Sequence, residues 1–209
     1  MTERTKRLSC VDCGIMKCGS GKGEYPDFCP TGELSEKDKA RLIDLYTEDA
    51  ENSKVAIAAA ETEFENYCCM TRVEETIEFA GKIGAEKIGI ATCIGLIRES
   101  RTLASLLRKH DFEVVSAVCK VGHISKKQIG FDRVSDKIGS IMCDPILQAE
   151  IMNREKTDLN IVMGLCVGHD SLFYKYAEGL TTTLVTKDRV TGHNPAAPLY
   201  LRDSYYKNL

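Results

Sequence analysis

Residues 158–176 read D-L-N-I-V-M-G-L-C-V-G-H-D-S-L-F-Y-K-Y, and the rest of the sequence is best interpreted outward from them. The run from Leu159 to Leu165 is apolar and rich in branched residues, as in a buried strand, and the spacing after Gly168 is helical. Cys166 lies between the two. Open α/β sheets bind ligands at this position, where a strand ends and the unpaired N–H groups of a helix begin. The stretch therefore predicts a strand, a cysteine-bearing turn and a helix.

Predicted strands and helices also alternate before and after this stretch. Strands are predicted at 87–92, 113–118 and 182–186, and helices at 96–110 and 145–154. The separations fit β-α-β units with right-handed crossovers. We therefore predict an α/β fold, with a Rossmann-like, mostly parallel sheet and flanking helices. Residues 120–138 show no period and are predicted to form a long loop on the ligand side of the sheet.

A helical segment is predicted before the sheet. Ser35 is a candidate N-cap for a first amphipathic helix, and an alanine-rich second helix is predicted at 51–66. Thr71 and Glu74 form a capping-box pattern that starts a third helix, ending near residue 83. The composition changes near residue 34. We predict two parts: a cysteine-rich metal-binding or cluster-binding segment at 1–34, and an α/β domain with a cysteine-lined crevice at 35–209.

Charge and hydropathy exclude several function classes. The chain has 209 residues and a net charge of −3, so it lacks the surplus of Lys and Arg that binding of nucleic acid needs. No segment approaches the roughly 20 apolar residues of a membrane helix, and the first residues lack the apolar core of a secretory signal. We expect a cytoplasmic protein that binds neither nucleic acid nor membrane.

Ten cysteines are a surplus for a cytoplasmic chain, and four of them are in the first 29 residues. Cys10, Cys13, Cys18 and Cys29 have gaps of two, four and ten residues within a stretch rich in glycine and proline. Such a loop needs a cross-link to be ordered, and the short first gap lets two sulfurs turn onto one metal. Disulfides are the least favoured alternative in a reducing compartment.

The identity of a metal in this loop stays open between two choices. A zinc ribbon would normally bring a second C-x2-C pair, which is missing here. Cys29-Pro30 is the pair that ends many ferredoxin cluster motifs, although the other gaps are not those of a ferredoxin. The pattern favours an iron–sulfur cluster, with 4Fe–4S as the expected type and zinc as the alternative.

A second set of cysteines follows predicted strands or precedes predicted helices: Cys93, Cys119, Cys143 and Cys166. In a parallel sheet these positions meet at one edge, so we predict a second cysteine-ligated centre in a crevice there. Cys68 and Cys69 precede the helix that starts at Thr71 and are substitute ligands. The alternative is that each cysteine is a small buried apolar residue.

Two polar groups are secondary candidates at the same edge. His169 follows Cys166 by three residues and is a candidate proton donor, metal ligand or structural residue. Lys187, Asp188 and Arg189 follow the last strand; they are suited to bind an anionic substrate, but the sequence favours charge pairing on the surface. No phosphate loop, dinucleotide fingerprint or nucleophile elbow is present.

Several motifs together resemble a known family. They are the four-cysteine series ending at Cys29-Pro30, I-A-T-C-I-G-L at Cys93, M-C-D-P at Cys143, G-L-C-V-G-H-D at Cys166 and K-D-R-V-T-G-H-N-P. The chain resembles, over nearly its whole length, a cysteine-rich family of uncharacterised metal-binding proteins of anaerobic prokaryotes, a domain of unknown function. The resemblance implies metal binding and no particular reaction.

Three functions are compatible with these patterns. The first is a redox iron–sulfur protein, in which an N-terminal cluster transfers electrons to a second centre that acts on a small molecule. The second is a non-enzymatic module for zinc binding, metal storage, delivery or sensing. The third is a thiol enzyme with Cys166 as nucleophile and His169 as base. The expected partner is a redox protein or a small-molecule substrate, and a homo-oligomer is left open.

Overall fold

The structure is a computed structural model that describes residues 7–21, 23–133 and 138–209. The first few residues of the N-terminal segment and four residues of the loop at 120–138 lie outside the described residues. The chain divides into two compact units, Met1–Ile57 and Ala58–Leu209. Helix α3 contains the division, whereas the sequence predicted a boundary near residue 34. Among the described residues, no helix has both the length and the apolar character that crossing a membrane requires.

The N-terminal unit consists of short helices and loops. Its elements are η1 (Cys10–Asp12), α1 (Pro30–Glu33), α2 (Glu36–Thr47) and the first half of α3 (Ala50–Asn66). The Ser35 side chain accepts a hydrogen bond from the Asp38 N–H and so caps α2, as the sequence predicted. Pro30 occupies the first turn of α1, where a missing N–H costs nothing.

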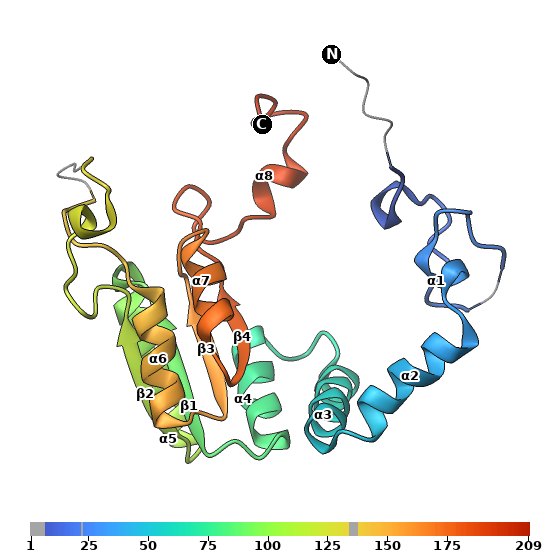
Figure 1. The fold of residues 1–209 in the computed structure, drawn as a ribbon, viewed down its shortest axis with the longest axis horizontal. Helices are drawn as coiled ribbons and strands as arrows, with labels where there is room; N and C mark the ends of the chain where they lie inside the picture. Colours follow the sequence, from blue (N-terminus) through green and yellow to red (C-terminus); the bar gives the residue numbers. More distant parts are fainter. Residues whose placement is uncertain (1–6, 22, 134–137) are drawn as a thin grey trace. The chain divides into compact units, whose positions relative to one another are not determined.

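The larger unit is built on a four-stranded parallel sheet. Its strands are β1 (Lys87–Thr92), β2 (Glu113–Val118), β3 (Leu159–Met163) and β4 (Leu180–Val185), in the order β2-β1-β3-β4. The register pairs Thr92 of β1 with Val118 of β2 and with Met163 of β3. These three strands therefore end at the same level, at the upper end of the sheet in Figure 1.

The helices cover both faces of this sheet. α5 (Ile97–Lys109) connects β1 to β2, α6 (Pro145–Glu155) connects β2 to β3, and α7 (His169–Tyr176) connects β3 to β4. The strand order reverses direction after β2, and right-handed crossovers then place α5 on one face and α6 with α7 on the other. In Figure 1, α6 lies in front of the sheet. α4 (Arg72–Lys82) packs near β4, where the Arg72 Nε donates to the Thr183 carbonyl at 2.9 Å.

The core lies between the sheet and these helices. β3 is buried over its whole length, as its run of branched residues predicts, and Phe173 of α7 is fully buried against it. The cluster under the carboxyl ends of the strands also contains two of the cysteines. Its buried members are Ala91, Cys93, Ala117, Cys119, Ala149, Met152, Val162, Leu165 and Phe173.

The predicted α/β fold is confirmed, including the parallel sheet and the flanking helices. β1 and β2 have the predicted bounds, and the Thr71–Glu74 capping box at the start of α4 is present. β4 begins two residues before the predicted strand. The loop at 120–138 contains a turn of 3-10 helix, η3 (Lys126–Ile129), which was not predicted from the sequence. Ile141 in the apolar run before Cys143 forms only an isolated bridge with Ser125.

Glycine substitutions test this packing. A Cβ at Gly89 in β1 would lie 2.5 Å from both the Asn160 Oδ1 and the Met152 Sδ, which are buried. We expect Gly89→Ala to lower the free energy of unfolding by about 1–3 kcal/mol because the core has no room for the methyl group. The measurement is urea unfolding followed by circular dichroism.

Gly81 in α4 provides the matched control, because a Cβ there would meet nothing within 4 Å. Gly81→Ala should be neutral or raise the free energy of unfolding by up to about 1 kcal/mol, as alanine is the better helix former. Equal effects of the two substitutions would contradict the described packing around Gly89.

Candidate functional site

Backbone hydrogen bonds bring the cysteines after β1 and β2 together. The Cys119 N–H donates to the Thr92 carbonyl at 2.8 Å, and the Cys93 N–H donates to the Met163 carbonyl at 3.1 Å. The ladder of the sheet thus continues one residue beyond each strand and ends with the two cysteines. Both are buried. The Ile94 N–H, in the first turn after Cys93, points at the Cys119 Sγ at 3.4 Å.

Cys143 reaches the same edge through the start of α6. The Asp144 N–H donates to the Cys119 carbonyl at 2.8 Å, which fixes residue 143 beside the end of β2. The Asp144 carboxylate accepts from the Leu147 N–H at 2.9 Å, and Pro145 begins the helix, as the sequence predicted. Cys143 is half-buried at this helix start.

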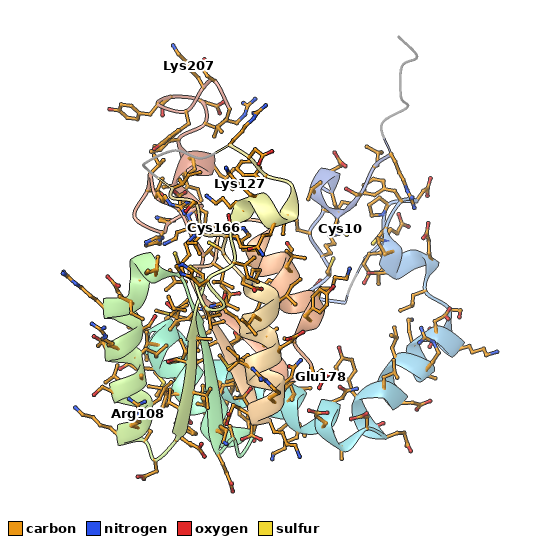
Figure 2. All side chains as sticks on the ribbon, turned by 60° about the vertical axis from the view of Figure 1, so that its left-hand side comes forward. Cys10, Arg108, Lys127, Cys166, Glu178 and Lys207 are labelled. Atoms are coloured by element: carbon orange, nitrogen blue, oxygen red, sulfur yellow. The ribbon has the colours of Figure 1, made fainter. Side chains whose placement is uncertain are left out.

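Cys166 lies in the turn between β3 and α7. Gly164 has a φ of +64°, and a Cβ there would collide with Leu96, so the sharp turn after β3 requires glycine. The Cys166 carbonyl accepts from the His169 N–H at 2.9 Å and the Asp170 N–H at 3.1 Å. In Figure 2, Cys166 lies at the upper end of the sheet and Arg108 near its opposite end.

Three of the thiols and His169 form a chain of contacts. Cys119 lies between Cys93 and Cys143 and forms side-chain hydrogen bonds with both. His169 forms a side-chain hydrogen bond with Cys143. The thiol-enzyme alternative needs a contact between the His169 imidazole and the Cys166 sulfur, whereas the sulfur partner of His169 among the described residues is Cys143.

These contacts separate the pKa values of the three thiols. Hydrogen bonding to Cys119 lowers the pKa of Cys93 to about 5, and hydrogen bonding to Cys119 and then His169 lowers the pKa of Cys143 to about 4. The pKa of Cys119 is raised, because its interactions with Cys143 and then Cys93, together with burial, favour the neutral thiol. The hydrogen bond to Cys143 raises the pKa of His169. The set therefore favours thiolates at its two ends, which titrate as one coupled group.

Cationic side chains surround the thiols. The Arg189 Nη2 donates to the Cys166 Sγ at 3.0 Å, and that contact raises the pKa of Arg189. Lys187 forms a side-chain hydrogen bond with Cys93. Lys120 carries its charge near Cys143 and donates to the Ile141 carbonyl at 2.6 Å. A thiolate next to Lys or Arg is more stable, so this environment suits sulfur ligands.

The thiols open into a pocket of about 540 Å³, a size typical of small-molecule sites. The cysteines form its floor at the sheet edge, and residues of the loop at 120–143 form its other wall. The residues that line it are Cys93, Ile94, Cys119, Lys120, Lys126, Ile129, Phe131, Ile138, Met142, Cys143, Cys166, His169 and Arg189. All four cysteines predicted for the second centre, with His169, are therefore brought to one pocket.

The predicted N-terminal cysteines also share one pocket, within the N-terminal unit. It has a volume of about 170 Å³ and is lined by Cys10, Cys13, Cys18, Cys29 and three apolar residues. Cys29 is buried and is the N-cap of α1. Hydrogen bonds from the side chain and then the backbone of Thr31 lower the pKa of Cys29, which favours its thiolate.

Cys68 and Cys69 are both exposed in the turn before α4. Cys68 lines a different pocket, together with Arg72 and Thr182, and neither residue lines the pocket at the sheet edge. Their use as substitute ligands of the second centre stays a prediction. Within the described ranges, no group of three or more His, Cys, Asp and Glu side chains is already arranged to hold a metal ion.

The fold and this crevice define a parallel α/β protein with a cysteine-lined pocket at the carboxyl edge of its sheet. The chain belongs to the family described as "Protein of unknown function (DUF1847)", which matches residues 29–184. It is also 45% identical over 192 residues to "Uncharacterized protein MJ0455" of Methanocaldococcus jannaschii, covering 91% of this chain and 96% of that protein. The resemblance to a family of uncharacterised proteins is confirmed; metal binding stays a prediction.

The contacts of the cations with the cysteines were not predicted from the sequence. The sequence favoured charge pairing on the surface for Lys187, Asp188 and Arg189, whereas in the structure Lys187 contacts Cys93 and Arg189 contacts Cys166. The sequence signal that could have placed these residues at the site is their position just after the last predicted strand, because that position lies at the carboxyl edge of the sheet. Lys120, directly after Cys119, carried the same signal.

The loop that carries Arg189 provides a pH prediction. The Asp188 carboxylate accepts hydrogen bonds from the Val190 N–H at 2.8 Å and the Thr191 N–H at 3.0 Å. The hydrogen bond from Thr191 is the main cause that lowers the pKa of Asp188. The loop's hydrogen bonds should therefore be fully formed above the ordinary aspartate value of about 3.9 and be lost as the pH falls through the lower, folded-state pKa.

We expect the backbone amide resonances of Val190 and Thr191 to shift on acidification with a midpoint below about 3.9, measured by ¹⁵N NMR. In Asp188→Asn the same titration should be absent. A midpoint at or above the ordinary value would contradict these hydrogen bonds.

Proposed function

We propose that this protein is a redox iron–sulfur protein with two cysteine-ligated centres. Cys10, Cys13, Cys18 and Cys29 would hold an electron-transfer cluster, and Cys93, Cys119, Cys143 and Cys166 would hold a second centre at the edge of the sheet. The observation that carries the proposal is the convergence of four thiols from separate parts of the chain on one pocket. Buried cysteines that serve only as packing have no reason to converge in this way.

The charge around the pocket supports a cluster of sulfide and iron. A cubane held by four thiolates is negatively charged and is stabilised by nearby cations and N–H donors. Lys187 and Arg189 each contact a cysteine, and the Ile94 N–H points at the Cys119 sulfur. Hydrogen bonds to cluster sulfurs and local charge also set the reduction potential of such centres.

His169 is suited to a proton-transfer role beside the second centre. It lines the pocket and forms a hydrogen bond with Cys143 from the first turn of α7. An imidazole there can give a proton to a molecule in the pocket and recover it from solvent. The centre would supply electrons, and His169 would supply the proton.

The second candidate is a non-enzymatic module that stores, delivers or senses metal, with zinc at the N-terminal site. The observation that favours it is the small N-terminal pocket, whose four cysteines suit one tetrahedral ion as well as they suit a cluster. The thiol-enzyme alternative requires revision, because His169 contacts Cys143 and the Cys166 sulfur contacts Arg189.

Metal and sulfide analysis of anaerobically purified protein separates these functions. We expect a brown protein with about eight iron and eight sulfide per chain, on the basis of four of each per cubane. Cys13→Ala and Cys166→Ala should each lose about half of both, because each removes a ligand of a different centre. Electron paramagnetic resonance of the reduced variants should then show only the remaining centre.

Cys69→Ala tests whether this residue is a substitute ligand. Cys69 is exposed and lines neither of the two cysteine pockets, so we expect the variant to keep the full iron and sulfide content; a loss would assign Cys69 to a centre. A colourless protein with one zinc per chain would overturn the proposal in favour of the second candidate. Unchanged metal content in Cys166→Ala would overturn the centre at the sheet edge.

A further inference from the structure

The pocket above the sheet-edge thiols has two chemically different ends. Cys93, Cys119 and Cys166 follow strands and Cys143 precedes α6, whereas Lys126, Ile129, Phe131 and Ile138 come from the loop. A metal centre held by the thiols would occupy the first end. The loop end would still be open to a second molecule, whose chemistry follows from the side chains there.

The loop end presents exposed apolar side chains. Ile129 is 63% exposed, Phe131 is 43% exposed and Ile138 is 58% exposed, and all three face the same pocket. Large apolar residues gathered on one wall of a concave site typically contact an apolar part of a ligand. The loop around them is held by backbone hydrogen bonds from Lys126 to Ser140 at 2.9 Å and from Met142 to Ile124 at 2.9 Å.

The charged side chains of the pocket are cationic. Of the residues that the structure describes, Lys120, Lys126 and Arg189 line it, and no Asp or Glu does. Among the described residues, no salt bridge joins any of the three to a carboxylate. Arg189 and Lys120 lie beside the thiols of Cys166 and Cys143, and within the described ranges the Lys126 ammonium contacts only backbone carbonyls. The positive charge of the pocket therefore favours a negatively charged ligand.

These cations are also oriented by contacts that leave donors available. The Lys126 Nζ donates to the carbonyls of Gly139 at 2.7 Å and Ile138 at 3.3 Å, and an ammonium has three donors. The Lys120 Nζ donates to one carbonyl, that of Ile141. Each ammonium is thus held at the wall of the pocket with at least one N–H left for a ligand oxygen.

We propose that the loop end of this pocket binds a small organic carboxylate with an apolar chain, within reach of the sheet-edge centre. The carboxylate is held by Lys126 with Lys120, and the chain lies against Ile129, Phe131 and Ile138. This inference rests on the proposed function and deepens it, because it names the class of molecule that reaches the centre.

The test uses hexanoate as the probe, with anaerobically purified, metal-analysed protein and isothermal titration calorimetry. Hexanoate should bind at least tenfold more tightly than hexylamine, which has the same number of carbon atoms and the opposite charge. It should also bind at least tenfold more tightly than acetate, which lacks the chain. Equal affinity for hexanoate and hexylamine, or for hexanoate and acetate, overturns the inference.

Three variants locate the carboxylate. Lys126→Gln should weaken hexanoate binding about tenfold or more, because it removes a charge-assisted hydrogen bond. Lys126→Arg keeps the charge and should restore most of the affinity, which separates loss of charge from disturbance of the loop. Lys127→Gln is the matched control: Lys127 is the next residue of η3, does not line the pocket and should leave affinity within twofold.

Metal content separates failure of this inference from failure of the proposed function. Protein with its full iron and sulfide that does not bind hexanoate overturns the carboxylate site alone. If Lys126→Gln and Lys127→Gln weaken hexanoate binding equally, that result also overturns the carboxylate site alone. Protein without a metal centre at the sheet-edge thiols overturns the proposed function and, with it, the inference.

Discussion

The in-register parallel pairing of β1 with β2 and β3 is the constraint on which the site depends. Because Thr92 is paired with both Val118 and Met163, the chain leaves the sheet at one level on all three strands. The next hydrogen bonds, to the N–H groups of Cys93 and Cys119, extend this register by one residue. A shift of one strand by one residue would turn its cysteine to the other face of the sheet.

The buried side-chain amide of Gln148 also holds the ends of β1 and β2 in alignment. Gln148 of α6 is fully buried, and its Nε2 donates to the Thr92 carbonyl at 3.1 Å and the Ala117 carbonyl at 2.7 Å. Thr92 is the last residue of β1 and Ala117 is the residue before the last of β2, so a single side chain joins the strand ends that carry Cys93 and Cys119. The Gln148 Oε1 has no hydrogen-bond partner among the described residues, which is a cost in free energy. The two hydrogen bonds from the Gln148 Nε2 offset this cost, because they fix the positions of the ends of β1 and β2.

Electrostatics distinguishes this crevice from an ordinary apolar core. Thiol groups at the end of a sheet would normally be neutral packing residues, but here the flanking positions supply Lys120, Lys187 and Arg189. Lys120 directly follows Cys119, and Lys187 and Arg189 lie two and four residues after the end of β4. The same backbone geometry that gathers the thiols therefore also gathers their positive charges, and thiolate and cation stabilise one another.

The sequence predicted the fold and the convergence of the cysteines well, because both depend on local signals. Branched runs identify β1 to β3, and Ser35, Thr71 and Asp144 are caps that can be recognised within four residues. The contacts of individual side chains were not predictable. His169 follows Cys166 by three residues yet bonds to Cys143, because the sequence gives no information on how α6 and α7 approach each other. Likewise, η3 was missed since its capping signal lies in a stretch without apolar period.

The topology also determines when the crevice can exist. Cys93 and Cys119 become neighbours as soon as β1 and β2 pair, but Cys166 arrives only when β3 inserts on the other side of β1, after the whole of α6 has been made. Long-range parallel pairing is a late event in folding, because the entropy of closing the intervening chain must be offset first. The complete thiol set is therefore a property of the finished sheet, so a ligand that needs all four thiols can bind only after β3 has joined β1.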